Sequence, residues 1–151
     1  MPVLFGEADF EVLCHATEDK DKVIEAVKNL IPVELHPSLQ ISEVKLEGHY
    51  HNPIIKINIT VAGDAAVRKT VSLIFNTLQP VEKNELTENL KLYIDETGNF
   101  YLRLNKNMAY KRYTALKCET GDVIRLKVKL RKEKPLSSTE ILNEYKNILT
   151  I

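Results

Sequence analysis

The segment at residues 123–131 alternates strictly between apolar and basic side chains, and this limits what the chain can fold into. The apolar and basic sets are Ile124, Leu126, Val128 and Leu130, and Arg125, Lys127, Lys129 and Arg131. Successive side chains of a β-strand point to opposite sides of a sheet, so the pattern predicts a strand with one apolar and one basic face. The chain should therefore contain a sheet whose second face is open and available for function.

Shorter patterns predict the other elements. Apolar residues at helical spacing predict three helices, of which the first follows Thr17 as its cap, the second ends at Pro80 and the third begins at a capping box of Ser137 with Glu140. Residues 81–89 have the composition of a polar connector. Apolar and β-branched runs predict further strands at residues 10–16, 41–47, 54–61, 90–95, 100–104 and 113–118.

These elements follow one another in the order βαββα-ββ-ββ-α. We expect an α+β fold with a single mixed or antiparallel sheet of about seven strands and three helices mainly on one face, because several connections are too short for parallel crossovers. The turn sequences ETGN (96–99) and ETGD (119–122) predict two hairpins. A length of 151 residues suits one domain spanning residues 1–151.

Composition argues against several classes of protein. No stretch of 18 apolar residues is present, so we expect a cytoplasmic protein without membrane contact. Cys14 and Cys118 do not form a disulfide framework and should be buried thiols. His49 and His51 supply half of a metal site, but no set with zinc spacing completes it. We therefore expect no catalytic residues, no metal and no cofactor.

Positive charge is concentrated late in the chain, although the formal net charge is zero. Residues 99–135 carry 11 Lys and Arg against 3 Asp and Glu, whereas residues 1–98 carry 9 against 16. Such clustering suits phosphate contacts, and tyrosines among the cations could stack on bases. A solvated strand face and half-buried packing tyrosines are the structural alternatives. The candidate RNA contacts are Arg103, Lys106, Tyr110, Lys111, Arg112, Tyr113, Arg125, Lys127, Lys129 and Arg131.

Three stretches in register resemble a known family. They are HATED (15–19), GHYHNPI (48–54) and LRLNKNMAY (102–110), the last leading into DVIRLKVKL (122–130). The chain resembles the archaeal predicted RNA-binding family described as predicted exosome subunits. The resemblance implies a fold similar to the large-subunit ribosomal protein that contacts 5S RNA. It also implies a cytosolic, dimeric protein linked to RNA processing or translation.

Together, the charge pattern and the resemblance predict a non-catalytic RNA-binding protein, linked to the exosome or to translation. Its expected partners are RNA, a protein complex for RNA processing and a second copy of itself. The alternative is an interaction adaptor in an RNA-processing complex, in which the basic face meets an acidic protein and has no significant RNA affinity of its own.

Overall fold

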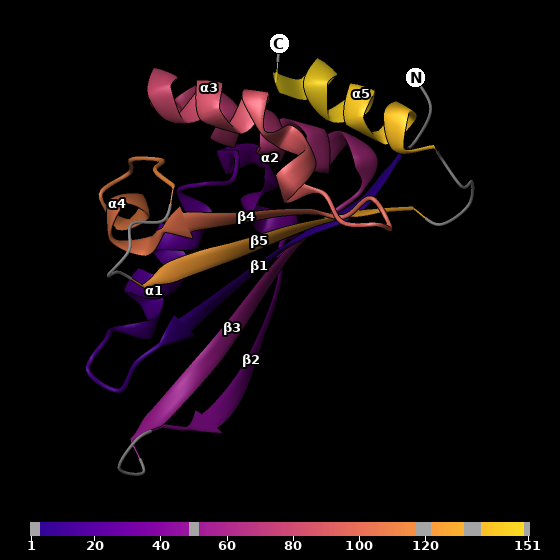
Figure 1. Ribbon diagram of the computed structural model, residues 1–151. Helices are drawn as coiled ribbons and strands as arrows, with labels where there is room; N and C mark the ends of the chain where they lie inside the picture. The colour runs from indigo at the N-terminus through magenta and orange to yellow at the C-terminus, as the bar shows by residue number, and fades with distance from the viewer. Residues whose placement is uncertain (1–3, 49–51, 117–121, 132–136, 150–151) are drawn as a thin grey trace.

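The computed structural model describes residues 4–48, 52–116, 122–131 and 137–149 (Figure 1). These residues form an α+β fold with one antiparallel sheet. The strands are β1 (Phe5–Cys14), β2 (Gln40–Glu47), β3 (Pro53–Ala62), β4 (Phe100–Asn105) and β5 (Val123–Leu130). The helices are α1 (Lys20–Lys28), α2 (Asp64–Thr77), α3 (Pro80–Glu88), α4 (Lys106–Tyr110) and α5 (Ser138–Leu149), with 3-10 helices η1 (Val33–Ser38) and η3 (Leu90–Tyr93).

Strand β1 lies at the centre of the sheet, whose order is β2-β3-β1-β5-β4 with every neighbouring pair antiparallel. Phe10 of β1 pairs with Ile59 of β3 and with Leu126 of β5. All three side chains are buried, and most apolar residues on the same face of these strands are buried with them, whereas Ile55 and Leu130 are partly buried. The predicted alternation of apolar and basic side chains in β5 is thus confirmed, because one face of the sheet packs against the hydrophobic core.

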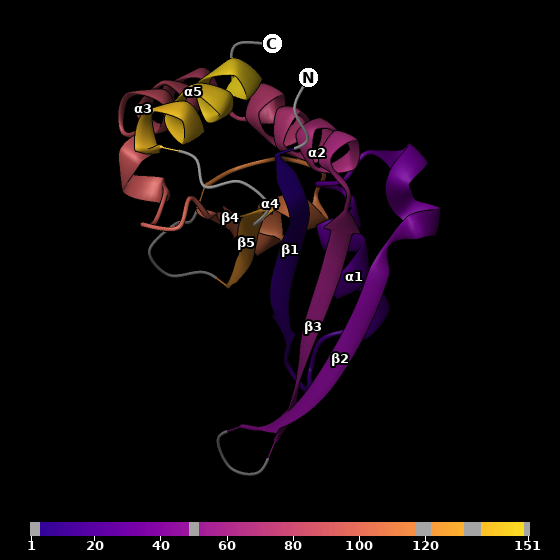
Figure 2. The ribbon, with the colours of Figure 1, turned by 90° about the vertical axis from the view of Figure 1, so that its right-hand side faces the viewer.

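The helices cover this apolar face (Figures 1 and 2). Val27 of α1 and Val71 of α2 belong to the same buried cluster as Phe10. The Tyr145 ring of α5 lies 5.1 Å from the Phe100 ring and 5.5 Å from the Phe5 ring, measured between centroids. None of the helices described is long and apolar enough to cross a lipid bilayer.

We call the opposite, helix-free side of the sheet the open face. Strands β1, β3, β4 and β5 present polar side chains on it, namely Glu7, Asp9, Glu11, Lys56, Asn58, Thr60, Tyr101, Arg103, Arg125, Lys127 and Lys129. The β2–β3 hairpin extends the sheet beyond the helices (Figure 2), and all eight residues of β2 are exposed.

The prediction of about seven strands and three helices is wrong in the middle of the chain. Residues 81–89, expected to be a connector, form α3 with Pro80 at its start. Residues 90–95 form η3 and contribute one isolated bridge, Ile94 with Phe100. Residues 113–118, as far as they are described, also contribute a single bridge, Leu116 with Leu104. Alternation over such short runs does not distinguish a strand from a tight helical turn.

The predicted helix ends are partly confirmed. Asp19 rather than Thr17 caps α1, because its carboxylate accepts a hydrogen bond from the amide of Asp21. The predicted capping box before α5 is present, since the amide of Glu140 donates to Ser137 Oγ over 3.2 Å. The segment 105–112, which showed no clear period, contains α4. The second predicted hairpin turn, at 119–122, lies largely outside the described residues.

The turn before β4 depends on Gly98, which has φ of +87° and lies against the core. A Cβ atom here would stand 2.4 Å from Leu130 Cδ1 and 2.8 Å from Ile141 Cδ1. We expect Gly98→Ala to lower the free energy of unfolding by roughly 2–4 kcal/mol, through backbone strain and overpacking. Chemical denaturation measures this change. Gly6→Ala is the control, because the nearest atom to its Cβ would be Arg131 Cγ at 3.5 Å. Equal losses of stability in both variants would contradict the packing argument.

Candidate nucleic-acid interface

The basic strand predicted from the sequence is β5, and its cations lie on the open face. Ile124, Leu126 and Val128 are buried, whereas Arg125 is exposed and Lys127 is half-buried. Because β5 lies between β1 and β4, Arg125 and Lys127 have an in-register neighbour on both strands, whereas Lys129 has one on β1 alone. These neighbours decide how much positive charge remains for a ligand.

Strand β1 places acidic residues directly beside part of the basic strand. Glu7 pairs in register with Lys129 and Asp9 with Lys127. Lys129 Nζ lies 2.9 Å from Asp9 Oδ2 and 3.1 Å from Glu7 Oε1, and the hydrogen bonds to Asp9 and Glu7 raise the pKa of this lysine. Lys129 is therefore largely neutralised by β1. Lys129, which was expected to contact phosphate, instead joins β5 to β1.

Positive charge is least compensated toward the β4 edge of the open face, although Glu11 of β1 lies in register beside Arg125. Arg103 of β4 pairs in register with Arg125 of β5, and both side chains are exposed. Within the described residues neither arginine forms an ion pair. Like charges placed opposite each other on neighbouring strands destabilise a sheet, so this pair needs a reason other than stability. An anionic ligand over the pair would supply that reason.

Tyr101 lies next to the arginine pair and is held in place by two contacts. Its hydroxyl donates a hydrogen bond to Asp95 Oδ2 over 2.9 Å, and Lys127 Nζ lies 5.5 Å from the centroid of its ring. Burial tends to raise the pKa of Asp95, but hydrogen bonds from Thr97, Asn99 and Tyr101 outweigh it and lower that pKa to about 2. Tyr101 was absent from the residues expected to bind RNA, although its alternation with Leu102 and Arg103 is visible in the sequence.

Lys106 occupies a different position from the one expected. Its side chain is 5% exposed, and its ammonium group donates to Glu18 Oε1 over 2.8 Å and to the carbonyl of Leu13 over 2.7 Å. Asp122 Oδ2 lies 3.6 Å away. A buried, ion-paired lysine is not available to a phosphate, so Lys106 is removed from the proposed interface.

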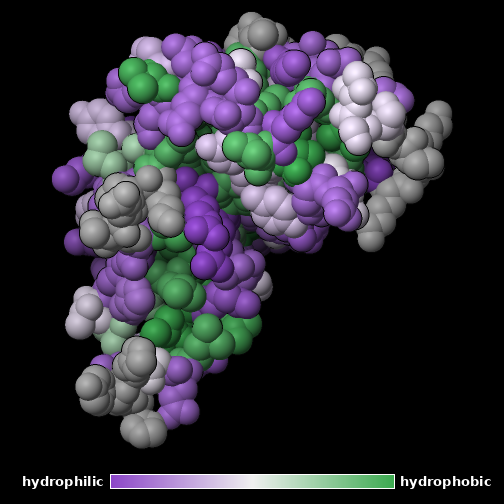
Figure 3. Space-filling view, viewed as in Figure 1, coloured by the Kyte–Doolittle hydropathy of each residue, from purple (hydrophilic) through white to green (hydrophobic). Residues whose placement is uncertain are grey.

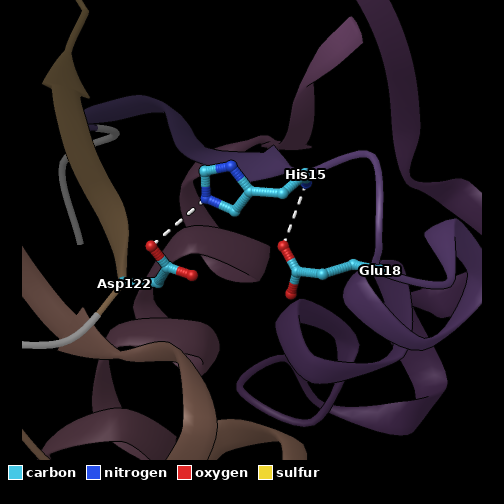
Figure 4. Close-up of side chains that lie close together, drawn as sticks. All are labelled: His15, Glu18 and Asp122. Carbon is cyan, nitrogen blue, oxygen red and sulfur yellow. Dashed lines mark hydrogen bonds and ion pairs between the residues drawn. The ribbon is translucent and has the colours of Figure 1, made fainter. Parts of the chain in front are cut away.

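Figure 4 shows His15, Glu18 and Asp122 close together, and the last two are the carboxylates that Lys106 approaches. His15 Nε2 lies 3.3 Å from Asp122 Oδ1, and the amide of His15 donates to Glu18 Oε1 over 3.0 Å. One ligand atom from each residue falls within 4.8 Å of the others, a spacing that could hold a metal ion. The Lys106 ammonium group already provides the positive charge at this point, so the cluster is better explained as an ion-paired link between β1, α4 and β5.

The four remaining candidates near α4 are exposed but lie away from the open face. Ala109 of α4 is buried, and its carbonyl accepts a hydrogen bond from the side chain of Asn29, the residue after α1, over 2.9 Å. Helix α4 therefore packs on the helix side of the sheet. The set consists of Tyr110, Lys111, Arg112 and Tyr113. A short ligand would have to pass around the end of β4 to reach both the cations of the open face and those near α4.

The last candidate, Arg131, is exposed just beyond β5, and its amide donates to the carbonyl of Leu4 over 2.7 Å. Cys14 is buried as predicted, and burial together with the charge of Glu18 raises the pKa of its thiol. That environment disfavours the reactive thiolate. Cys118, His49 and His51 lie outside the described residues.

The sequence of the chain is similar to that of known proteins. A model of the RNA-binding family matches residues 7–130. The chain belongs to this family. A Pyrococcus abyssi member, named an RNA-binding protein, is 32% identical over 118 residues, which are 78% of this chain and 76% of that protein. The matched region includes β5 and all of β1 except its first two residues, and therefore every polar residue named on the open face.

Solved structures of archaeal proteins share the family fold. A DUF54 protein from Archaeoglobus fulgidus has a TM-score of 0.76 at 25% identity, covering 95% of this chain and 99% of that one. A DUF54 protein from Methanothermobacter thermautotrophicus has a TM-score of 0.74 at 25% identity, covering 97% and 98%. In the family member described here, two of the stretches that carried the resemblance, residues 15–19 and 102–110, meet at the Lys106–Glu18 ion pair.

Proposed function

We propose that this chain is a non-catalytic RNA-binding protein whose RNA lies on the open face, over β4 and β5. The observation that carries the proposal is the pair of exposed arginines, Arg103 and Arg125, which lie opposite each other and form no ion pair within the described structure. Membership of the RNA-binding family and the name of the P. abyssi relative support it.

The chemistry follows from the spacing of the strands. Side chains two residues apart on one strand face are about 7 Å apart, a repeat similar to that of phosphates along one nucleic-acid strand. Arg103 and Arg125 would bind phosphate oxygens through their forked guanidinium groups. Lys127 would add a third cation, and Arg131 a fourth if the RNA continues along β5. Lys129, held by Glu7 and Asp9, would keep the strand in position rather than bind RNA.

A salt titration tests the electrostatic part of the proposal. With three cations over phosphates of a single strand, log affinity should fall linearly with log salt, with a slope of roughly −2 at about −0.7 per phosphate. Fluorescence anisotropy of a labelled single-stranded RNA measures the slope. An RNA affinity that does not change between low and high salt would rule out binding through the arginine pair.

We also infer a cellular role in RNA processing, in association with the exosome, or in translation, with the protein acting in the cytosol as a homodimer. This part rests on the family resemblance of residues 15–19, 48–54 and 102–110. Isolation of partners from native lysate, with and without nuclease, tests it. Partners that are lost after nuclease treatment would be held through RNA, whereas partners that remain would bind the protein directly.

One observation favours the adaptor as a second candidate function. Leu13, Val44 and Leu46 are 38%, 49% and 42% exposed, and they lie on the open face of β1 and the β2–β3 hairpin. Figure 3 shows hydrophobic residues gathered over this lower part of the molecule. Exposed apolar patches of this kind mark protein contacts. A protein partner on the hairpin would be compatible with RNA on β4 and β5, because the two surfaces occupy opposite edges of the sheet.

A further inference from the structure

A hollow of about 500 Å³ lies beyond the outer edge of β4. Strand β4 contributes Tyr101 and Arg103 to its lining, the segment after α3 contributes Leu92 and Tyr93, and Glu85 comes from α3 itself. Its volume is within the usual range for small-molecule pockets, and it begins where the arginine pair of the open face ends. A single nucleotide reaching over the β4 edge would enter it.

The side chain of Tyr101 lies between the open face and the hollow. Lys127 lies over the ring from the β5 side, and Tyr101 also lines the hollow on the outer side of β4. The hydrogen bond to Asp95 restrains the hydroxyl end of the ring. A ring already fixed in this way loses little conformational entropy when a base stacks on it. Stacking of an unpaired base on such a ring is tolerant of sequence, because every base has a π-face.

The polar groups of the hollow select a neutral ligand with hydrogen-bond donors. Its carboxylates would repel a phosphate, which is better placed at Arg103 on the rim. Glu82 accepts a hydrogen bond from the amide of Leu116, and Asp95 accepts from Tyr101. Glu85 has no such partner among the described residues, so its carboxylate is available as an acceptor.

The base edge that suits a carboxylate carries two parallel N–H donors. Guanine presents its ring N–H beside its amino group, which matches the two carboxylate oxygens. Uracil presents one N–H between two carbonyl oxygens, which the carboxylate would repel. We propose that the hollow beside β4 receives one unpaired guanine of the RNA, stacked on Tyr101 and hydrogen-bonded to Glu85, with its phosphate at Arg103. The inference rests on the proposed function and specifies single-stranded RNA as the ligand.

The experiment compares short oligouridines that differ at one central position: guanosine, uridine or an abasic site. All three carry the same phosphates, so only the base changes. Stacking is worth about 1–3 kcal/mol, so the unaltered protein should bind the guanosine oligonucleotide roughly 5- to 150-fold more tightly than the abasic one. In Tyr101→Leu this advantage should shrink at least severalfold with an unchanged salt slope, since only the contact with Glu85 remains. In Glu85→Gln the preference for guanosine over uridine should shrink.

Tyr110→Leu is the matched control, because Tyr110 is 45% exposed against 42% for Tyr101 but lies on α4. It should retain the preference for guanosine. Equal affinity of the unaltered protein for the guanosine and abasic oligonucleotides would overturn the inference. This comparison uses the unaltered protein alone, so it does not depend on the folding of a variant. The proposed function would survive that result if affinity for both still depended on Arg103 and Arg125. Failure to bind any of the oligonucleotides would overturn both proposals.

Discussion

Replacing Arg103, Arg125 and Lys127 together by Gln should weaken binding of single-stranded RNA on the order of 50-fold at 0.15 M salt. Each phosphate contact contributes about 0.7 to the salt slope, so three lost contacts remove roughly two units of slope, and their electrostatic contribution at this salt concentration is lost. The fold should persist, since Arg103 and Arg125 are exposed and unpaired within the described structure. Removing two like charges from opposite positions should even favour folding slightly.

The matched control removes the same number of charges from the helix side of the molecule. Lys22, Lys69 and Lys146 are exposed on α1, α2 and α5, and their replacement by Gln should change RNA affinity only a fewfold. An equal loss of affinity in both triple variants would mean that only net charge matters. An unchanged affinity in the open-face variant, with normal melting, would contradict the proposed surface and leave the adaptor as the better account.

The second large effect concerns stability. Lys106→Met should lower the free energy of unfolding by about 2–4 kcal/mol, measured by chemical denaturation. Breaking a buried ion pair usually costs about 3–5 kcal/mol. The expected loss is somewhat smaller because the side chains of Glu18 and Asp122 are 30% and 49% exposed and can be hydrated. The carbonyl of Leu13 would also lose its donor from Lys106.

Two further variants separate this mechanism from a general effect of the substitution. Lys111→Met, on an exposed residue five positions further along, should change stability by no more than about 0.5 kcal/mol. Adding Glu18→Gln to Lys106→Met should cost less than the sum of the two single variants, because they share one interaction. Strict additivity would show that Lys106 and Glu18 do not stabilise each other.

The alternation of β5 was predictable because it is a local pattern over eight residues that a strand alone explains. The neutralisation of Lys129 was not, because it depends on which strand lies beside β5. Glu7, Asp9 and Glu11 alternate with apolar residues as clearly as the cations do, but the sequence does not state that β1 is the neighbour. The charges of residues 1–98 and 99–135 were counted separately. That count therefore overestimated the positive charge left free on β5.

The burial of Lys106 was also not predictable from the sequence, for the same reason. In the sequence it is one cation among several in residues 103–112, and nothing local distinguishes it from Lys111. Its ion-pair partners come from the loop after β1 and from the residue before β5, so only the folded chain identifies it. Tyr101 is the opposite case. The alternation of β4 places it beside Arg103, and this pattern alone would have justified including it among the candidates, from which it was absent.

Mapping the bound RNA on the protein tests the central claim most directly. Amide chemical shifts of the isotope-labelled protein, recorded while a short single-stranded RNA is added, report which residues the ligand reaches. The account predicts the largest changes at Tyr101, Arg103, Arg125 and Lys127, with little change on the helix side of the sheet. Changes confined to α4 and to Lys111 and Arg112, with β4 and β5 unaffected, would contradict it.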